Sequence, residues 1–259
     1  MNREILSYIS ASRLKTWQTC RRQFYFRYIA KIETPLSPPL FVGREIHEAL
    51  RWWNWARWRG ESPDRDTLRS EFQDSWNQNL KRETILWKAS DDPDKIKEAA
   101  WKTLDTYLDQ GPVPLLERPE GVEVRIEAEL GRQGYPPLLG IIDLIRPNGV
   151  IVDYKSSSRA PSGKLVAHQH ATQLACYALL YRDATGRNEG GFELHYLIKS
   201  RSPKLVVSTF GPLSKNHEEE LYQLIDDYLL GISREAWIKS PGQHCAWCDY
   251  FDRCGSLNS

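Results

Sequence analysis

The sequence predicts an α/β fold in which helices pack on a mixed central sheet. The main reason is the order of its periodic segments: after a long helical stretch the core order is helix, three strands, helix and strand. The second reason is length, because 259 residues can bury the core of one large domain or two small ones. The net charge of +1 excludes a globally basic nucleic-acid binder, so any such contact must come from a local patch.

The helical elements come first along the chain. Ser10 is expected to cap a short helix that ends near Thr19. The proline-rich KIETPLSPPLF is predicted to be a loop. The stretch from 43 to 110 contains three candidate helices separated by Ser-Pro and Asp-Pro, at Glu45–Arg59, Thr67–Glu83 and Asp94–Asp109.

The period then changes to that of strands. VEVRIEAEL alternates apolar and charged residues, which is typical of a half-buried strand. The later strand candidates are LLGIIDLI, GVIVDYK, FELHYLIK and KLVVSTF, and the later helices are Ala167–Ala184 and Ser214–Ala236. No run of about eighteen apolar residues occurs, so we expect no membrane span. MNREILSYIS lacks the apolar core of a signal peptide, and we expect a cytoplasmic protein.

The loop between two apolar strands decides where two aspartates lie. A two-residue Asn-Gly turn would place Asp143 and Asp153 on opposite faces of the sheet. A three-residue loop is better suited to Pro147-Asn148-Gly149, with proline opening a type I turn and glycine in the left-handed position. This loop places Asp143 opposite Asp153, and Lys155 joins the same face.

Two opposed carboxylates repel each other unless a cation lies between them. Carboxylate oxygens suit Mg²⁺ or Mn²⁺, so the hairpin predicts a metal site. Lys155 would then orient or deprotonate a water, or stabilise an anionic transition state. The alternative is an ordinary Asp–Lys ion pair on a solvated surface.

Three further residues could complete this site. Gln173 and Tyr177 are four apart on a predicted helix and therefore share a face. They could hold a phosphate backbone or the lysine, or form a buried hydrogen-bonded pair without a catalytic role. His47, in VGREIHEAL, is either a further metal ligand or a structural histidine.

The cysteines predict a second metal site. CAWCDYFDRC places Cys245, Cys248 and Cys254 within ten residues, and a compact site needs a fourth ligand. Cys176 lies in an apolar helical run and is expected to be a buried thiol. Cys20 and His244 remain as candidates, and Cys20 would close nearly the whole chain into one loop. The spacing does not separate a [4Fe–4S] cluster from zinc, and unligated thiols are the alternative.

In their order, these motifs resemble the RecB-type nucleases of the PD-(D/E)XK superfamily, in the iron–sulfur branch that includes the AddB nuclease domain and the CRISPR adaptation exonucleases. The matching segments are SASRLKTWQTCRRQFYFRYI, GREIHEAL, GIIDLI, DYK, QLACY and the three terminal cysteines. Ile142 stands where many members carry arginine, and no GxxxxGK[ST] helicase motif is present.

The resemblance implies one nuclease domain over 1–259 with a restriction-endonuclease-like core, a helical insert at 43–110, and an iron–sulfur clasp formed by 240–259 with Cys20. The implied cofactors are a [4Fe–4S] cluster and Mg²⁺ or Mn²⁺. The cluster ligands would be Cys20, Cys245, Cys248 and Cys254. The cation ligands would be His47, Asp143, Asp153 and the carbonyl of Tyr154. The catalytic set would be Asp143, Asp153, Lys155, Gln173 and Tyr177.

Basic and aromatic residues are the candidate DNA contacts. Arg21 and Arg22 beside Cys20 could bind phosphates, and RWWNWARWRG places several tryptophans among arginines. Trp52 and Trp55 share a helix face that Trp58 continues, whereas Trp53 points elsewhere. This face could guide single-stranded DNA or could pack the insert on the sheet, and the packing interpretation is the favoured one.

The function predicted from these residues is a metal-dependent DNA exonuclease that acts on DNA ends or single strands, in repair, recombination or CRISPR adaptation. A helicase or recombination partner would be a separate chain. One alternative is a non-catalytic DNA-binding or assembly subunit that keeps the nuclease fold. Another is a zinc-containing DNA-binding protein.

Overall fold

The computed structural model describes residues 7–255 and has the predicted α/β architecture. The expected strands and the expected helices are all present, with shifted ends. In chain order the elements are α1 (Ala11–Thr19), α2 (Arg21–Phe24), the π-helix η1 (Tyr25–Ile29), α3 (Pro38–Trp58), α4 (Arg65–Arg82), α5 (Pro93–Gln110), β1 (Gly121–Ala128), β2 (Leu138–Arg146), the 3₁₀ turn η2 (Pro147–Gly149), β3 (Val150–Ser157), α6 (Gly163–Thr185), β4 (Gly191–Ile198), β5 (Lys204–Phe210), α7 (Lys215–Ser233), the 3₁₀ turn η3 (Gln243–Trp247) and α8 (Phe251–Gly255).

The sheet has five strands in the order β1-β2-β3-β4-β5. It is mixed, because β3 and β4 are parallel and the other neighbouring pairs are antiparallel. The parallel pair is connected by α6, since a parallel connection has to return along the sheet and a tight turn cannot do this. The prediction of a mixed sheet is confirmed.

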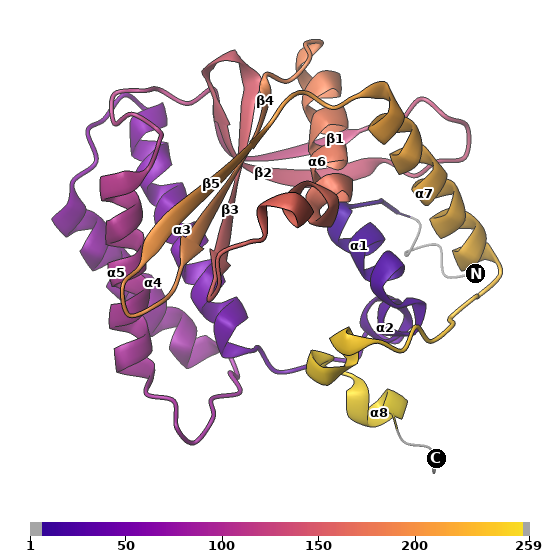
Figure 1. The fold of residues 1–259 in the computed structure, drawn as a ribbon, viewed down its shortest axis with the longest axis horizontal. Helices are drawn as coiled ribbons and strands as arrows, with labels where there is room; N and C mark the ends of the chain where they lie inside the picture. The colour runs from indigo at the N-terminus through magenta and orange to yellow at the C-terminus, as the bar shows by residue number, and fades with distance from the viewer. Residues whose placement is uncertain (1–6, 256–259) are drawn as a thin grey trace.

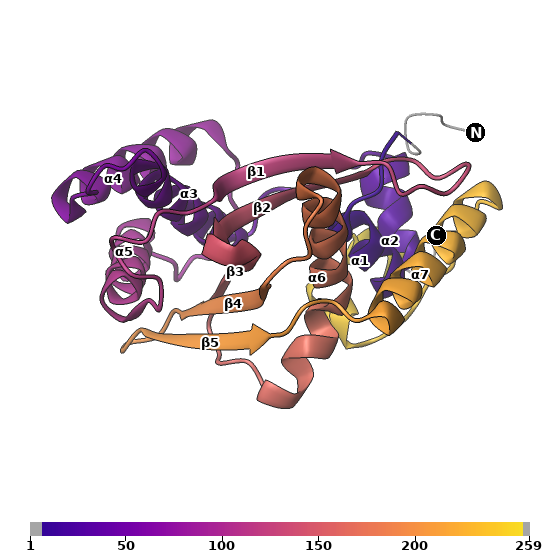
Figure 2. The same cartoon turned by 90° about the horizontal axis from the view of Figure 1, so that it is seen from above.

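Helices cover both faces of the sheet (Figures 1 and 2). On one face, α1, α6 and α7 pack around a core that includes Trp17, Phe24 and Tyr181. On the other face, α3, α4 and α5 enclose a second core that includes Phe41 and Trp76. The sheet residues between these two cores are therefore shielded from water on both sides, which suits the apolar strands that flank the aspartates.

Helix α3 begins earlier than the sequence pattern predicted. Pro38 and Pro39 form its first turn after Ser37, so the prediction of a loop that continued to Phe41 is wrong. A proline is tolerated there because the first N–H groups of a helix have no intrahelical acceptor in any case. By contrast, Ser10 caps α1 as predicted, and its side chain accepts a hydrogen bond from the Arg13 N–H at 3.3 Å.

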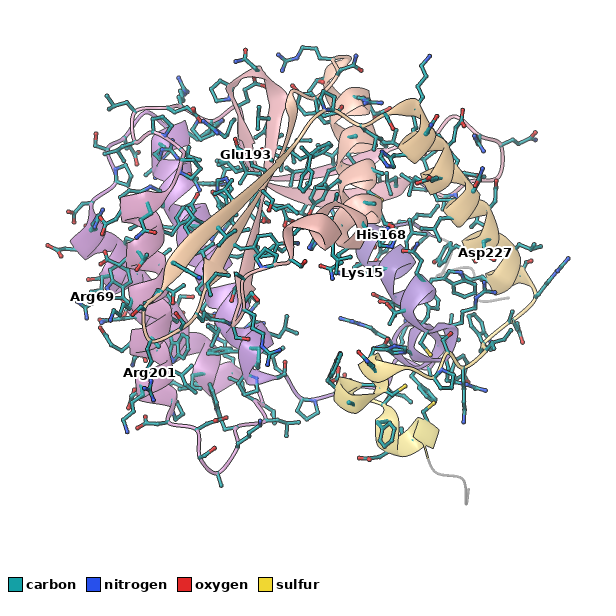
Figure 3. All side chains as sticks on the ribbon, in the orientation of Figure 1. Lys15, Arg69, His168, Glu193, Arg201 and Asp227 are labelled. Carbon is teal, nitrogen blue, oxygen red and sulfur yellow. The ribbon has the colours of Figure 1, made fainter. Side chains whose placement is uncertain are left out.

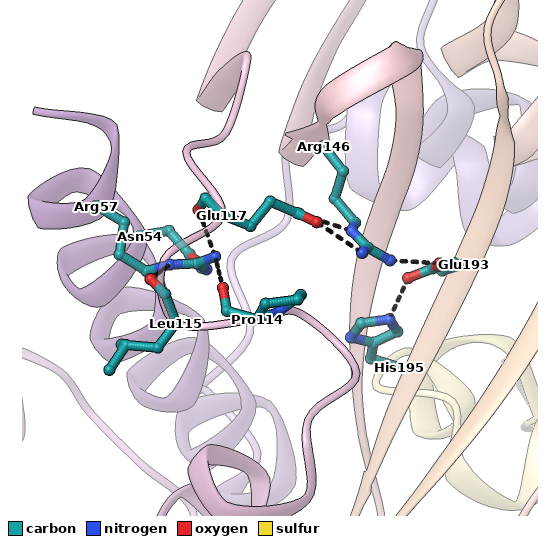
Figure 4. A network of polar contacts seen from close by, with 8 residues as sticks. All are labelled: Asn54, Arg57, Pro114, Leu115, Glu117, Arg146, Glu193 and His195. Atoms are coloured by element: carbon teal, nitrogen blue, oxygen red, sulfur yellow. Dashed lines mark hydrogen bonds and ion pairs between the residues drawn. The ribbon is translucent and has the colours of Figure 1, made fainter. Parts of the chain in front are cut away.

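A buried polar network joins α3 and the segment after α5 to the sheet (Figure 4). The guanidinium of Arg57 donates to the carbonyls of Pro114 and Glu117, at 2.6 Å each. The Glu117 carboxylate accepts from Arg146 on β2, which also pairs with Glu193 on β4 at 2.7 Å. The helices therefore reach the sheet through charge-assisted hydrogen bonds as well as through apolar packing.

The segment that follows α7 returns to the N-terminal helices and passes beside α2 in Figure 1. The Arg22 N–H donates to the Ile238 carbonyl at 3.1 Å, and the Tyr250 hydroxyl donates to the Ile32 carbonyl at 3.2 Å. The rings of Phe24 and Trp237 stack with centroids 6.2 Å apart. Across residues 7–255, no helix combines the length and the apolar character needed to cross a membrane.

Candidate active site

The β2–β3 hairpin brings the two predicted aspartates to adjacent positions. Its pairs Leu144–Val152 and Arg146–Val150 leave Pro147–Gly149 as a three-residue loop, so the predicted register is confirmed. Gly149 has φ +71°, and a side chain there would overlap the Tyr181 ring, which explains the glycine. The ladder ends at Leu144–Val152, and Asp143 and Asp153 occupy the positions immediately beyond that last pair.

Asp153 lies at the centre of a hydrogen-bonded group built from β3 and α6. Lys155 Nζ is 2.6 Å from Asp153 Oδ2 and donates to Gln173 Oε1 at 2.9 Å. Gln173 Nε2 donates to Asp153 Oδ1 and to the Tyr177 hydroxyl, both at 2.9 Å. The structure thus brings together the four residues that the sequence placed on a strand and on a following helix.

Asp143 is held from the side of α3 and from the neighbouring strand. Its Oδ2 accepts a hydrogen bond from the Tyr154 backbone N–H at 2.9 Å and lies 3.4 Å from His47 Nδ1. Asn54, further along α3, donates to the Tyr154 hydroxyl at 3.0 Å. His47 therefore lies at Asp143, and Tyr154 contacts Asp143 through its backbone N–H, whereas the metal-site hypothesis assigns its carbonyl as a ligand.

Burying the charges of this group costs free energy. Asp153 is 3 % exposed. Its burial raises its pKa, the charge of Asp143 adds to the effect, and Lys155 opposes it. Burial favours the neutral form of His47, but the hydrogen bond and charge of Asp143 outweigh this, so the pKa of His47 is raised. Burial also raises the pKa of Tyr177, which stays a neutral donor.

These carboxylates therefore form a site that a cation would stabilise. Within residues 7–255, no three His, Cys, Asp or Glu side chains are close enough to form a ready-made metal group. The donor types nevertheless fit a hard divalent cation, because two carboxylates and an imidazole lie on adjacent strands and one helix. Lys155 is the cation that partly balances Asp153 here.

A further carboxylate at this site was not identified from the sequence. Glu123 on β1 lies between the pairs Val122–Leu144 and Val124–Ile142, and so opposite Asp143. Its φ of +49° is unusual for a residue with a side chain. Burial raises the pKa of Glu123, and the charge of Asp143 adds to this. In the sequence Glu123 is one of the charged residues of an alternating strand, and only the register places it at the site.

The four predicted cluster cysteines line one cavity of about 280 Å³. Cys20 comes from the end of α1, and Cys245, Cys248 and Cys254 come from the last turns of the chain. His244, the other candidate ligand, also borders this cavity. Burial raises the pKa of Cys248, and the nearby sulfurs of Cys20 and Cys245 contribute. Cys176 is 1 % exposed, and burial raises its pKa to about 12, which confirms a core thiol.

The burial of the tryptophans on α3 differs from the predicted pattern. Trp53 belongs to the buried core, whereas Trp55 and Trp58 are 42 % and 45 % exposed. The favoured packing interpretation therefore fits Trp52, which packs against this core, and fails for most of the surface of Trp55 and Trp58. The error arose because the side of α3 that meets the sheet is not visible in the tryptophan spacing alone.

The two arginines beside Cys20 differ in their contacts with the protein. Arg21 forms two hydrogen bonds to Asp227 on α7, at 2.8 and 2.9 Å, and its guanidinium lies 4.5 Å from the Trp17 ring centroid. The Arg22 guanidinium lies 5.8 Å from the Tyr25 ring centroid. Arg21 thus joins α1 to α7, and a phosphate would have to compete with Asp227 for it.

The comparisons with known proteins agree with this geometry. The family model of the PD-(D/E)XK nuclease superfamily matches residues 8–255. The fold is similar to a crystal structure from Eubacterium rectale described as a "Putative exonuclease", with a TM-score of 0.64 and 14% identity over 99% of this chain and 91% of that chain. A structure of the protein SSO0001 covers 54% of this chain and 61% of its own, with 19% identity and a TM-score of 0.37, too low to support an argument. No curated protein matches the chain significantly.

Proposed function

The chain belongs to the PD-(D/E)XK nuclease superfamily, and we propose that it is a metal-dependent DNA exonuclease that hydrolyses phosphodiester bonds at DNA ends or in single strands. The observation that supports this most is the group formed by Asp143, Asp153 and Lys155, in which Gln173 contacts both Asp153 and Lys155. A binding module has no need of two opposed carboxylates in an apolar hairpin, because their repulsion destabilises the fold.

We propose that Asp143, Asp153, His47 and the Tyr154 carbonyl hold Mg²⁺ or Mn²⁺. When bound, such a cation lowers the pKa of water and reduces the negative charge of the scissile phosphate. The ligand types support this assignment, because oxygen atoms are the preferred partners of both cations.

Lys155 is proposed to position the attacking water and to balance the charge that develops on the phosphate. Gln173 fixes the lysine by accepting its hydrogen bond at 2.9 Å, and the Tyr177 hydroxyl in turn contacts Gln173. Both side chains come from α6, which packs on β1 and β2, so the lysine is oriented by a rigid element.

A [4Fe–4S] cluster on Cys20, Cys245, Cys248 and Cys254 is the proposed structural cofactor. The support is that all four thiols border one cavity and come from opposite ends of the chain. With four thiolates as ligands, the cluster would have no free position for substrate, and its contribution would be to hold 240–259 against α1 within a single domain over 1–259.

The similarity in fold to the Eubacterium rectale protein is consistent with the exonuclease part of the proposal, and the family resemblance suggests work in repair, recombination or CRISPR adaptation beside a separate helicase. The test is cleavage of end-labelled single- and double-stranded DNA with Mg²⁺ or Mn²⁺, using anaerobically prepared protein. We expect Lys155→Ala to lose about a hundredfold or more in rate. Lys102→Ala, an exposed lysine on α5, is the matched control.

Each outcome of this experiment decides between two functions. Cleavage by the wild type and by Lys102→Ala, but not by Lys155→Ala, supports the nuclease, and the position of the label gives the polarity. If the wild type with its cofactor intact fails to cleave any of these substrates, the non-catalytic DNA-binding subunit becomes the better assignment.

A further inference from the structure

A large cavity lies beside Lys155, on the face of the sheet covered by α1, α6 and α7. Its volume is about 610 Å³, and Lys155 and Gln173 form part of its wall. The remainder of the wall comes from the three helices, so the cavity extends from the candidate active site along their surfaces. Figure 3 shows Lys15 and His168 at neighbouring positions on this side, from α1 and α6.

The wall of this cavity is chemically suited to an anion. Lys15 and Lys155 line it together with His168 and His217, and Glu220 is the one carboxylate among the described residues of the wall. Those residues include no phenylalanine, tyrosine or tryptophan on which a base could stack. The wall can therefore contact a sugar-phosphate backbone but offers no stacking surface to the bases.

Lys15 is the residue that points most directly to a ligand. It is exposed, and within residues 7–255 it forms no ion pair, unlike Arg21 on the same side of the molecule. Although its side chain reaches solvent, desolvation by the nearby protein atoms lowers the pKa of Lys15. The positive charge of Lys155 lowers it further, and the charge of Asp153 opposes this to a smaller extent. Two cations that line one cavity repel, and a bound phosphate would remove this repulsion.

We propose that this cavity is a phosphate subsite for the DNA strand being cut, in which Lys15 contacts a phosphate next to the scissile one. The proposal rests on the proposed function, because the position of Lys155 defines where the scissile phosphate lies. It adds to that function a strand path between α1, α6 and α7, recognised through the backbone and independent of base sequence.

The test is equilibrium binding of fluorescent single-stranded oligonucleotides in EDTA, so that binding is measured without cleavage. We expect Lys15→Ala to weaken binding about fivefold, as is usual for one exposed charge pair. The slope of log affinity against log salt should fall by about 0.7, the value for one phosphate contact on a single strand. Lys15→Arg should restore both quantities, and Lys102→Ala should change neither.

The location of the contact is tested with neutral methylphosphonate linkages placed one at a time along the oligonucleotide, and with or without a terminal phosphate. In the wild type, one substitution beside the cleaved linkage, or loss of the terminal phosphate, should weaken binding, and in Lys15→Ala the same change should have no further effect. The methylphosphonate series identifies a contact with an internal phosphate, and removal of the terminal phosphate identifies a contact with that group.

The subsite would be refuted if Lys15→Ala bound with wild-type affinity and salt dependence. It would also be refuted if every methylphosphonate weakened the variant and the wild type equally. Neither result touches the nuclease assignment, which is judged by the cleavage of DNA by the wild type and its loss in Lys155→Ala.

Discussion

At the residue scale, the candidate site depends on a carboxylate placed where its charge is unfavourable. Asp153 is almost completely buried and faces a second aspartate, and its burial raises its pKa. A raised pKa in a carboxyl group means that the folded protein loses stability as pH rises through that pKa. Lys155 and Gln173 reduce this loss of stability because both contact the Asp153 carboxylate directly.

Asp153→Asn should therefore abolish cleavage without lowering the melting temperature of the metal-free protein, because it removes a buried charge. Added Mg²⁺ or Mn²⁺ should raise the melting temperature of the wild type. At a cation concentration of a hundred times the Kd, the free energy of unfolding should rise by about 2.7 kcal/mol. It should not raise that of the variant. Asp94→Asn, an exposed carboxylate on α5, is the control, and an equal metal effect in Asp153→Asn would contradict the assignment.

His170 on α6 provides a second pH dependence of stability. Burial lowers the pKa of His170 to about 4, with contributions from Lys155 and Lys15, and its Nε2 lies 2.9 Å from the Tyr196 hydroxyl. The unfolded chain therefore binds more protons between about pH 4 and 6.5, so the free energy of unfolding should fall as pH drops through this window.

We expect His170→Gln to show a shallower fall in stability over the same window, because the amide can occupy the Nε2 position without titrating. Denaturant unfolding of both proteins at a series of pH values measures the difference. Parallel curves for wild type and variant would show that His170 does not titrate in this way.

At the element scale, α3 has two faces with different partners. Its inner face carries His47 and the buried Trp53, and its outer part exposes Trp55, whose indole N–H donates to the Val122 carbonyl at 3.3 Å. The same helix thus positions one candidate metal ligand and presents an aromatic surface to solvent. Because the helix is fixed to the sheet by the Arg57 network, both features are held in place relative to Asp143.

Two alanine substitutions on α3 should separate these faces. Trp53→Ala should lower the free energy of unfolding by about 3–5 kcal/mol, because it leaves a cavity in the core. Trp55→Ala should leave the fold nearly unchanged and weaken single-strand binding by about 1–3 kcal/mol, if a base stacks on this ring. Denaturant unfolding and binding in EDTA measure the two effects, and unchanged binding in Trp55→Ala would exclude it as a DNA contact.

At the scale of the whole molecule, the contact between the two chain ends closes a loop of nearly the full chain. Such a closure reduces the entropy of the unfolded state, and the gain grows slowly with loop length. The loop-closing contacts that are visible are the Arg22–Ile238 and Tyr250–Ile32 hydrogen bonds and the cavity of four cysteines.

If a cluster joins these ends, Cys20→Ser should remove iron and sulfide from anaerobically purified protein and lower its melting temperature. Cys176→Ala should keep the full iron and sulfide content, because that thiol lies in the core away from the cavity. Metal and sulfide analysis with the visible absorption spectrum measures this. Zinc without sulfide in the wild type would favour the zinc alternative, and no metal at all would identify the thiols as unligated.

Much of the fold was predictable because its signals are local. Strand alternation, the Ser10 cap and the chemistry of Pro147-Asn148-Gly149 act between residues close in sequence. The loop sets a register that places Asp143 and Asp153 just beyond the last pair of the ladder. The start of α3 was missed because prolines are compatible both with a loop and with the first turn of a helix, and only the packing of Phe41 into the second core decides between them.

By itself, then, the sequence determined the strands, the opposed aspartates, Lys155 and the residues on α6 that hold it, because turn type and periodicity transmit this information through the backbone. The tertiary structure alone decided which tryptophan is buried, that Arg21 is bound to Asp227, that Glu123 lies opposite Asp143, and that Lys15 faces a cavity beside Lys155. These facts depend on which surfaces meet when distant elements pack, and spacing along the chain does not specify this.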